Sequence, residues 1–270
     1  MDWINDCHVH LMGKEKPAEI LRGMDKNKVE KCIVFAPIGK NDTLQETVEA
    51  DDFAAKIQKS APKRFYGFVR INPTLPGACS EIERGIKKLK LRGVKMLPKK
   101  WYPHGEEARN SYELINTLNV PMLFHSGILW MKGAMSTYCR PAYYEALYDY
   151  PKIKFALAHI SWPWTDECIA VANRFWAGDF NRKQCIIDTT SGAPRIWKAD
   201  ALRKALSILP PDCIMFGSDF WPWHKDYRAY IEADFSIYGE LGVSKPYLQK
   251  IFNSNFDEFF KPPKKARKGA

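Results

Sequence analysis

The sequence lacks several features that would assign it to other classes of protein. Its 270 residues contain no apolar run of about 18 residues or more, so no membrane-spanning helix is predicted. The seven cysteines include no Cys-x-x-Cys pair, and their odd number does not suit a disulfide framework. The first residues run directly into a strand-like segment, without the pattern of a signal peptide. These absences predict a cytoplasmic protein with reduced thiols.

Acidic residues are scarce relative to basic ones. The formal net charge is +10, and the last ten residues, 261–270, contain five basic residues and no acidic residue. We expect this Pro- and Lys-rich tail to be disordered. The charge that remains over residues 1–260 is modest, and it suits either an anionic substrate or simple solubility. We expect a small-molecule substrate, and neither a nucleic acid nor a membrane as partner.

The rest of the chain alternates regularly between strand-like and helical segments. Apolar, β-branched and aromatic residues mark eight predicted strands, at Ile4–His10, Lys31–Pro37, Phe65–Asn72, Arg92–Pro98, Pro121–Gly127, Ile153–Ser161, Gln184–Ser191 and Cys213–Phe220. Helical spacing predicts helices at Pro17–Val29, Leu44–Lys59, Ala78–Leu89, Glu106–Leu118, Pro141–Tyr148, Thr165–Phe175, Lys198–Ile208, Asp226–Tyr238 and Lys245–Phe252. Most predicted strands are continuous apolar runs, as in a parallel sheet covered on both faces. Eight such units predict a single α/β domain, a (β/α)8 TIM barrel, over residues 1–260.

An open, doubly wound sheet is the alternative arrangement of the same elements. Dinucleotide-binding sheets of that kind carry a Gly-x-Gly-x-x-Gly turn after the first strand, and none follows His10. The chain shows no domain linker and no repeat of solenoid length. The barrel is therefore the favoured prediction, and in a barrel the carboxyl ends of the strands face one common site.

The first predicted strand ends in Asp6-Cys7-His8-Val9-His10. Alternate residues of a strand point to the same face, so both imidazoles lie close enough to reach one metal ion. Taken alone, the pair is equally typical of two surface histidines.

Further polar residues lie at other predicted strand ends. Four of the six histidines do so, because His125 and His159 end the fifth and sixth predicted strands. Asp219 ends the eighth, and Lys95 lies among apolar neighbours in the fourth. A core histidine is the alternative for any one position, but the whole set indicates a metal centre at one rim of the barrel.

The motifs at these strand ends resemble the amidohydrolase superfamily, which begins with Asp-x-His-x-His. The sequences Gly-Val-Lys-Met-Leu-Pro, Phe-His-Ser-Gly, Ala-His and Phe-Gly-Ser-Asp-Phe-Trp-Pro resemble its "amidohydrolase 2" branch. That branch contains metal-dependent hydrolases of TIM-barrel fold, together with aminocarboxymuconate-semialdehyde and γ-resorcylate decarboxylases. The resemblance spans all eight predicted strands, and it is specific for fold and metal site but not for substrate. Relatives in the branch often form dimers, so a homodimer is one expectation.

The resemblance implies that His8, His10, His125 and Asp219 bind one divalent metal ion. Zinc is the expected ion, and manganese or another divalent metal is the alternative. The resemblance also implies that His159 is catalytic, as an acid/base or as a group that polarises a carbonyl. Asp219 is then catalytic as well, because it can accept a proton while it touches the ion.

Lys95 has three interpretations. In binuclear members of the superfamily a lysine on the fourth strand is carbamylated and bridges two metal ions, with His159 as a ligand of the second. In the narrower branch a lysine in a Gly-Val-Lys-x-x-Pro sequence accompanies a single ion. Contact with a substrate anion and a structural ion pair are the remaining roles.

A second set of residues is predicted to contact the substrate. Arg70, on the third predicted strand, either binds a carboxylate at the barrel mouth or forms an ion pair on the outer face. Aromatic side chains in four loops predict a pocket for a planar, apolar substrate, with loop packing or a subunit interface as alternatives. They are Trp101, Tyr102, Trp130, Trp162, Trp164, Phe220, Trp221 and Trp223. His104 and His224, in loops of the same face, are either substrate contacts or solvated histidines.

Four functions fit these residues. The favoured one is hydrolysis of a small, carboxylate-bearing or aromatic ester, lactone or amide by metal-activated water. The alternative is non-oxidative, metal-dependent decarboxylation of an aromatic or unsaturated carboxylic acid at the same site. A TatD-like nuclease also begins with His-x-His, but Lys95 stands where that family places a metal-binding glutamate. A catalytically inactive barrel is disfavoured, because no expected ligand is missing.

Overall fold

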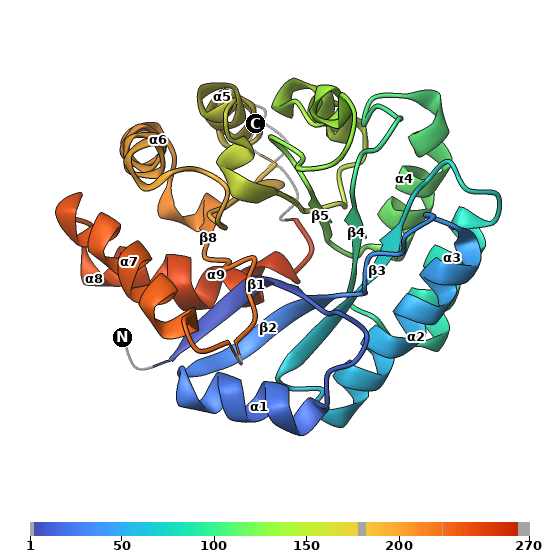
Figure 1. Ribbon diagram of the computed structural model, residues 1–270. Helices are drawn as coiled ribbons and strands as arrows, with labels where there is room; N and C mark the ends of the chain where they lie inside the picture. Colours follow the sequence, from blue (N-terminus) through green and yellow to red (C-terminus); the bar gives the residue numbers. More distant parts are fainter. Residues whose placement is uncertain (1–2, 178–181, 223, 264–270) are drawn as a thin grey trace.

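The computed structural model describes residues 3–177, 182–222 and 224–263. Eight parallel strands lie side by side in chain order and form a nearly closed barrel, which the helices surround (Figure 1). The strands are β1 (Ile4–His10), β2 (Val29–Phe35), β3 (Phe65–Ile71), β4 (Gly93–Met96), β5 (Met122–Phe124), β6 (Phe155–Leu157), β7 (Cys185–Asp188) and β8 (Ile214–Met215). The prediction of a single-domain (β/α)8 TIM barrel is confirmed. Residues 264–270 of the predicted tail lie outside the described residues.

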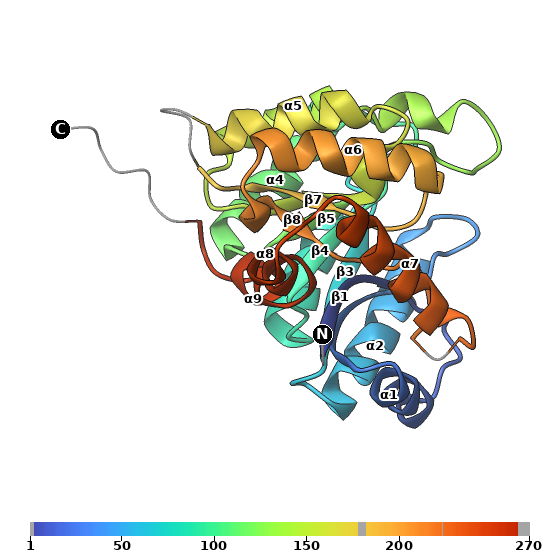
Figure 2. The same cartoon turned by 90° about the vertical axis from the view of Figure 1, so that its left-hand side faces the viewer.

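Helices cover the outside of the barrel. The α-helices are α1 (Pro17–Lys26), α2 (Leu44–Ser60), α3 (Ala78–Glu83), α4 (Glu106–Leu118), α5 (Thr165–Trp176), α6 (Arg195–Ile208), α7 (Tyr227–Glu240), α8 (Lys245–Gln249) and α9 (Asn255–Phe259). In two views α5 and α6 lie side by side on one flank, away from α1 and α2 (Figures 1 and 2). Within the described part of the chain, every helix is too short or too polar to cross a membrane.

Shorter helical turns fill several connections. The 3-10 helix η3 (Pro141–Asp149) replaces the α-helix predicted for 141–148. The helix predicted for 245–252 is α8 followed by the π-helical turn η7 (Lys250–Ser254). Helix α2 begins at Leu44, as predicted, because Thr43 and Glu46 form a capping box at its first turn.

Both faces of the strands are buried, as their continuous apolar sequences predict. On the inner side Phe35 and Phe68 pack edge to face, with ring centroids 5.8 Å apart. The alternate residues Val34 and Val69 are also fully buried. All seven cysteines are free, and all but Cys79 are buried, so the prediction of a disulfide-free chain is confirmed.

Backbone hydrogen bonds join β1 to the segment that follows β8. Cys7 N donates to Phe216 O at 3.0 Å, and Asp219 N donates to His8 O at 2.9 Å. This seam brings the first strand and the last loop together. It therefore places Asp219 directly beside the two histidines of β1.

The buried carboxylate of Asp6 holds the same seam. Its Oδ1 accepts from Ser218 N at 3.0 Å and from His8 N at 2.9 Å. Its Oδ2 accepts from Ser218 Oγ at 2.5 Å and from Tyr227 Oη at 2.7 Å. Because four donors converge on one carboxylate, Asp6 is a structural link between β1 and the last loop, not a member of the pocket.

Candidate active site

His8, His10 and Lys95 lie on strands β1 and β4, whereas the other candidate metal ligands and acid/base residues lie just beyond strand ends. His125 follows the last residue of β5, and Asp219 lies beyond β8. His159 lies on the 3-10 turn η4 (Ala158–Ser161), so the strand predicted for 153–161 was too long. The physical reason is that His159 adopts a left-handed φ of +63°, which is incompatible with continued strand pairing; Asp219 is also left-handed, with φ +58°.

The turn that carries His159 is strained. Three consecutive residues, His159, Ile160 and Ser161, have φ of 63°, 48° and 52°. For residues with a Cβ this conformation costs about 1–2 kcal/mol each, so the surroundings must hold it. Two hydrogen bonds do so, since His159 N donates to Thr190 Oγ1 at 3.0 Å and Ser161 Oγ donates to Ser126 Oγ at 2.7 Å.

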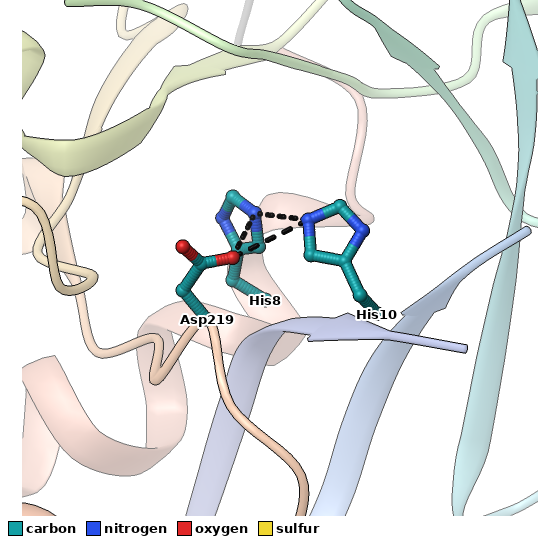
Figure 3. A group of neighbouring side chains, drawn as sticks. All are labelled: His8, His10 and Asp219. Atoms are coloured by element: carbon teal, nitrogen blue, oxygen red, sulfur yellow. Dashed lines mark hydrogen bonds and ion pairs between the residues drawn. The ribbon is translucent and has the colours of Figure 1, made fainter. Parts of the chain in front are cut away.

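His8, His10 and Asp219 point toward one another (Figure 3). The Nε2 atoms of the two histidines are 3.2 Å apart, and Oδ1 of Asp219 lies 3.4 Å from one and 3.3 Å from the other. Ligand atoms about 2.0–2.1 Å from a tetrahedral ion are roughly 3.3 Å apart, so these three atoms fit one divalent cation. Burial opposes ionisation of Asp219, but the neighbouring His8 and His10 hold its pKa below the ordinary value.

Asp188, which the sequence analysis did not identify, fixes the orientation of His8. Its Oδ2 lies 2.6 Å from Nδ1 of His8, and both side chains are buried. Burial lowers the pKa of His8 and raises that of Asp188 to about 6. The Nδ1 proton is donated to Asp188, which leaves Nε2 of His8 as the free ligand atom. The sequence did contain a signal for Asp188, namely its position. Asp188 follows the apolar run Cys185–Ile187 and is the last residue of the strand.

Lys95 projects from β4 into the same region. Its Nζ lies 3.4 Å from Nε2 of His8 and 4.6 Å from the centroid of the Phe35 ring. Burial lowers the pKa of Lys95 to about 8. Within the described residues, His8, His10 and Asp219 are the only cluster of three or more candidate ligands, so a second ion at Lys95 stays a prediction.

His125 lies near the cluster without joining it. Its Nε2 lies 3.1 Å from Ile128 O, which can only accept, so this nitrogen carries the proton. The His125 ring centroid is 5.0 Å from that of His159. Its role as a fourth metal ligand therefore remains a prediction.

His159 is held through one ring nitrogen. Its Nδ1 lies 2.5 Å from Ser191 O and 2.8 Å from Thr190 Oγ1. Because a carbonyl oxygen only accepts, Nδ1 carries the proton and Nε2 is the free nitrogen. Burial lowers the pKa of His159, so a proton placed on Nε2 is readily released.

A pocket of about 390 Å³ opens over these groups. It is lined by His10, Ile38, Arg70, Lys95, Leu97, His125, Ile128, Leu129, Trp130, Met131, His159, Trp162, Ser191, Gly192 and Asp219. This volume lies within the usual range for small-molecule sites. The predicted residues Arg70, Trp130 and Trp162 therefore lie at the pocket.

Arg70 lies beside Lys95 in the sheet, because the two residues are paired across β3 and β4. Its Nε donates to Pro37 O at 3.0 Å, and its Nη1 lies 3.4 Å from Oδ1 of Asp42. Its Nη2 is buried without a partner among the described residues. Arg70 thus forms an ion pair, but at the pocket and not on the outer face.

Other predicted substrate contacts lie outside the pocket. Trp101 is buried in the core, and His104 packs against Tyr102 with ring centroids 5.4 Å apart. Trp221 and His224 both pack against Phe220, with centroid distances of 5.5 and 4.8 Å. Neither Trp221 nor His224 is among the residues that line the pocket, so their substrate contacts stay predictions. Among the described residues of this loop, Asp219 lines the pocket, and Trp223 lies outside the described residues.

The active sites of (β/α)8 barrel enzymes lie at the carboxyl ends of the strands. This chain gathers histidines, a carboxylate and a buried lysine at that end of its barrel. The chain belongs to the amidohydrolase family, because the Amidohydrolase (Amidohydro_2) family model matches residues 5–261. This result confirms the family resemblance of the motifs. No curated protein matches the sequence.

Solved structures share the fold at low sequence identity. A 2,6-dihydroxybenzoate decarboxylase complexed with 2,6-dihydroxybenzoate has a TM-score of 0.71 at 15% identity, covering 96% of this chain and 99% of that chain. The 5-carboxyvanillate decarboxylase of Sphingomonas paucimobilis has a TM-score of 0.65 at 17% identity, with coverages of 92% and 83%. That of Novosphingobium aromaticivorans, complexed with manganese and 4-hydroxy-3-methoxy-5-nitrobenzoic acid, has 0.65 at 16% identity, with coverages of 89% and 78%.

Proposed function

We propose that the protein is a metal-dependent carboxy-lyase that releases CO2 from a small, planar aromatic or unsaturated acid. One observation carries the proposal: a single pocket combines two cationic side chains, Lys95 and Arg70, with indole walls and the free Nε2 of His159. An acid with a flat ring matches that combination of charge and shape. The decarboxylases of similar fold support the choice of reaction.

His8, His10 and Asp219 would hold the divalent ion, with His125 as the fourth ligand that the family resemblance implies. Manganese and zinc both suit nitrogen and carboxylate donors, and the manganese-bound decarboxylase of similar fold favours testing manganese first. When bound, the ion would supply Lewis-acid polarisation of an oxygen of the substrate.

The chain's own residues bind and orient the acid. Lys95 and Arg70 attract the anion, and both are held in place, by Phe35 and by Asp42 respectively. Trp162 offers an aromatic surface on which a planar ring can lie. This arrangement excludes water from one face of the substrate ring and presents the substrate to His159.

His159 supplies the proton. With Nδ1–H donated to Ser191 O, the free Nε2 takes up a proton from solvent and passes it to the carbon that carries the carboxylate. The bond from that carbon to the carboxyl carbon then breaks, its electron pair stays on the ring, and CO2 leaves. The lowered pKa of His159 favours this delivery, because the protonated ring is a strong acid.

Hydrolysis is the second candidate function. Asp219 is half-buried at the pocket and ionised, so it can accept a proton from an attacking water. A panel of hydroxybenzoates and lactones, offered to protein loaded with manganese or zinc, separates the two. We expect CO2 with the corresponding phenol. Lactone opening without CO2 from any acid would replace the carboxy-lyase by a hydrolase.

A further inference from the structure

Trp162 forms one wall of the pocket, and its backbone is fixed by the loop after β5. Ile128 N donates to Trp162 O at 2.7 Å, and Trp162 N donates to His159 O at 3.0 Å. A Cβ on Gly127 would lie 2.4 Å from Trp162 O, so the two loops pack backbone to backbone. The main chain of this wall therefore has little freedom to shift.

The indole of Trp162 is fixed by a second tryptophan, Trp197, in the first turn of α6. The two rings are stacked, with centroids 5.3 Å apart and planes at 28°. Trp197 is 52% exposed and is not among the residues that line the pocket. It therefore acts on the pocket only through Trp162.

The loop that leads to Trp197 also holds His159. Ser191 O accepts the hydrogen bond from Nδ1 of His159, and a Cβ on Gly192 would lie 3.1 Å from Cβ of His159. One segment, the loop 189–194 and the first turn of α6, thus fixes both the imidazole of His159 and the indole of Trp162. A substrate ring that lies on Trp162 is by this arrangement also placed beside His159.

We propose that Trp197 is a positioning residue that sets the pocket width, so that the pocket accepts one planar ring and rejects a fused pair of rings. Trp130, the other indole at the pocket, offers no comparable restraint, because it is 79% exposed. Without the stack, the Trp162 indole can turn to another rotamer and leave room for a second ring. The proposal rests on the proposed function for its choice of aromatic acids.

The test compares manganese-loaded wild type with Trp197→Ala, with Trp197→Phe as the conservative rescue. Ile196→Ala is the matched control, because Ile196 is the adjacent residue and is 76% exposed. The probes are 2,6-dihydroxybenzoate and 1-hydroxy-2-naphthoate. In Trp197→Ala the ratio of kcat/KM values should shift toward the naphthoate by about tenfold, mainly through KM. Trp197→Phe and Ile196→Ala should keep the wild-type ratio.

Calorimetric titration of both acids in a His159→Ala background, which we expect to lose turnover, gives the same ratio from dissociation constants. Thermal unfolding checks that each variant is folded, and Trp197→Leu replaces Trp197→Ala if the latter unfolds. An unchanged affinity ratio in the folded variant overturns the role of Trp197. If neither acid yields CO2 while the affinity ratio shifts as expected, the proposed carboxy-lyase function is wrong. The positioning role of Trp197 is then still supported.

Discussion

Oδ2 of Asp188 lies 2.6 Å from Nδ1 of His8, and both side chains are buried. The carboxylate sets the tautomer of the ring, so Nε2 faces His10 and Asp219 without a proton. A residue of β7 therefore determines which atom of β1 is offered to a metal ion.

Replacing that carboxylate tests the relationship. Asp188→Asn keeps the shape of the side chain but removes its charge, so His8 becomes a weaker donor. We expect metal affinity to fall about 10–100-fold. Competition with a chromophoric chelator measures it. Asp226→Asn, at an exposed carboxylate, is the control, and equal affinity in the two variants would show that Asp188 does not support His8.

The metal ligands can be separated from the acid/base residue by elemental analysis. We expect one ion per chain in the wild type, and loss of both metal and activity in His8→Ala and Asp219→Ala. His159→Ala should keep most of its metal but lose turnover, and His224→Ala should keep both. Two ions per chain, or half the metal in His159→Ala, would make the site binuclear and give Lys95 the bridging role.

Asp6 predicts a particular dependence of stability on pH. Burial raises its pKa from the ordinary 3.8 to about 7, so the folded state keeps a proton that the unfolded state releases. Its contribution to stability is complete below the unfolded pKa and is lost as pH rises through the folded pKa.

Urea denaturation of wild type and Asp6→Asn between about pH 5 and about pH 7.5 isolates this contribution. Because each pKa unit corresponds to about 1.4 kcal/mol, the stability advantage of the wild type should fall by about 2–3 kcal/mol over that range. A pH-independent difference between the two proteins would show that the Asp6 pKa is not raised.

Gly217 is required by close packing at the centre of the site. A Cβ there would lie 2.6 Å from Cγ2 of Thr190, 2.7 Å from Oδ1 of Asp188 and 2.9 Å from Cβ of His8. Gly217→Ala should therefore destabilise the protein by about 1–3 kcal/mol and weaken metal binding.

The matched control is Gly239→Ala, in α7, where nothing lies within 4 Å of the added methyl group. It should be neutral or stabilise the protein by up to about 1 kcal/mol, because alanine favours the helix. Thermal unfolding of both variants measures the contrast. Equal stabilities would mean that the site accommodates a side chain at Gly217.

The sequence pattern was sufficient to predict the barrel and the pair on β1, because alternation places His8 and His10 on one face whatever surrounds them. It was not sufficient for the turns of His159 and Asp219. Their left-handed angles occur at residues other than glycine and depend on contacts with distant residues such as Thr190. Sequence motifs therefore predict which rim carries the site, but not the backbone that aims each side chain.

Local sequence also could not predict which aromatic loop residues line the pocket. Trp162 and Trp221 occupy similar Trp-Pro sequences after two strands, yet only Trp162 lines the pocket. The difference depends on packing partners, because Trp162 stacks on Trp197 whereas Trp221 packs against Phe220 of its own loop.

The fate of a labelled carboxyl group shows directly whether the protein decarboxylates its substrate. Metal-loaded protein is incubated with carboxyl-labelled 2,6-dihydroxybenzoate, and labelled CO2 and phenol are counted for wild type and for His159→Ala of equal metal content. We expect equimolar CO2 and phenol from the wild type and neither from the variant. Labelled CO2 at the same rate from both proteins would contradict the role of His159. No CO2 from any hydroxybenzoate, with stoichiometric ring opening of lactones, would contradict the carboxy-lyase itself.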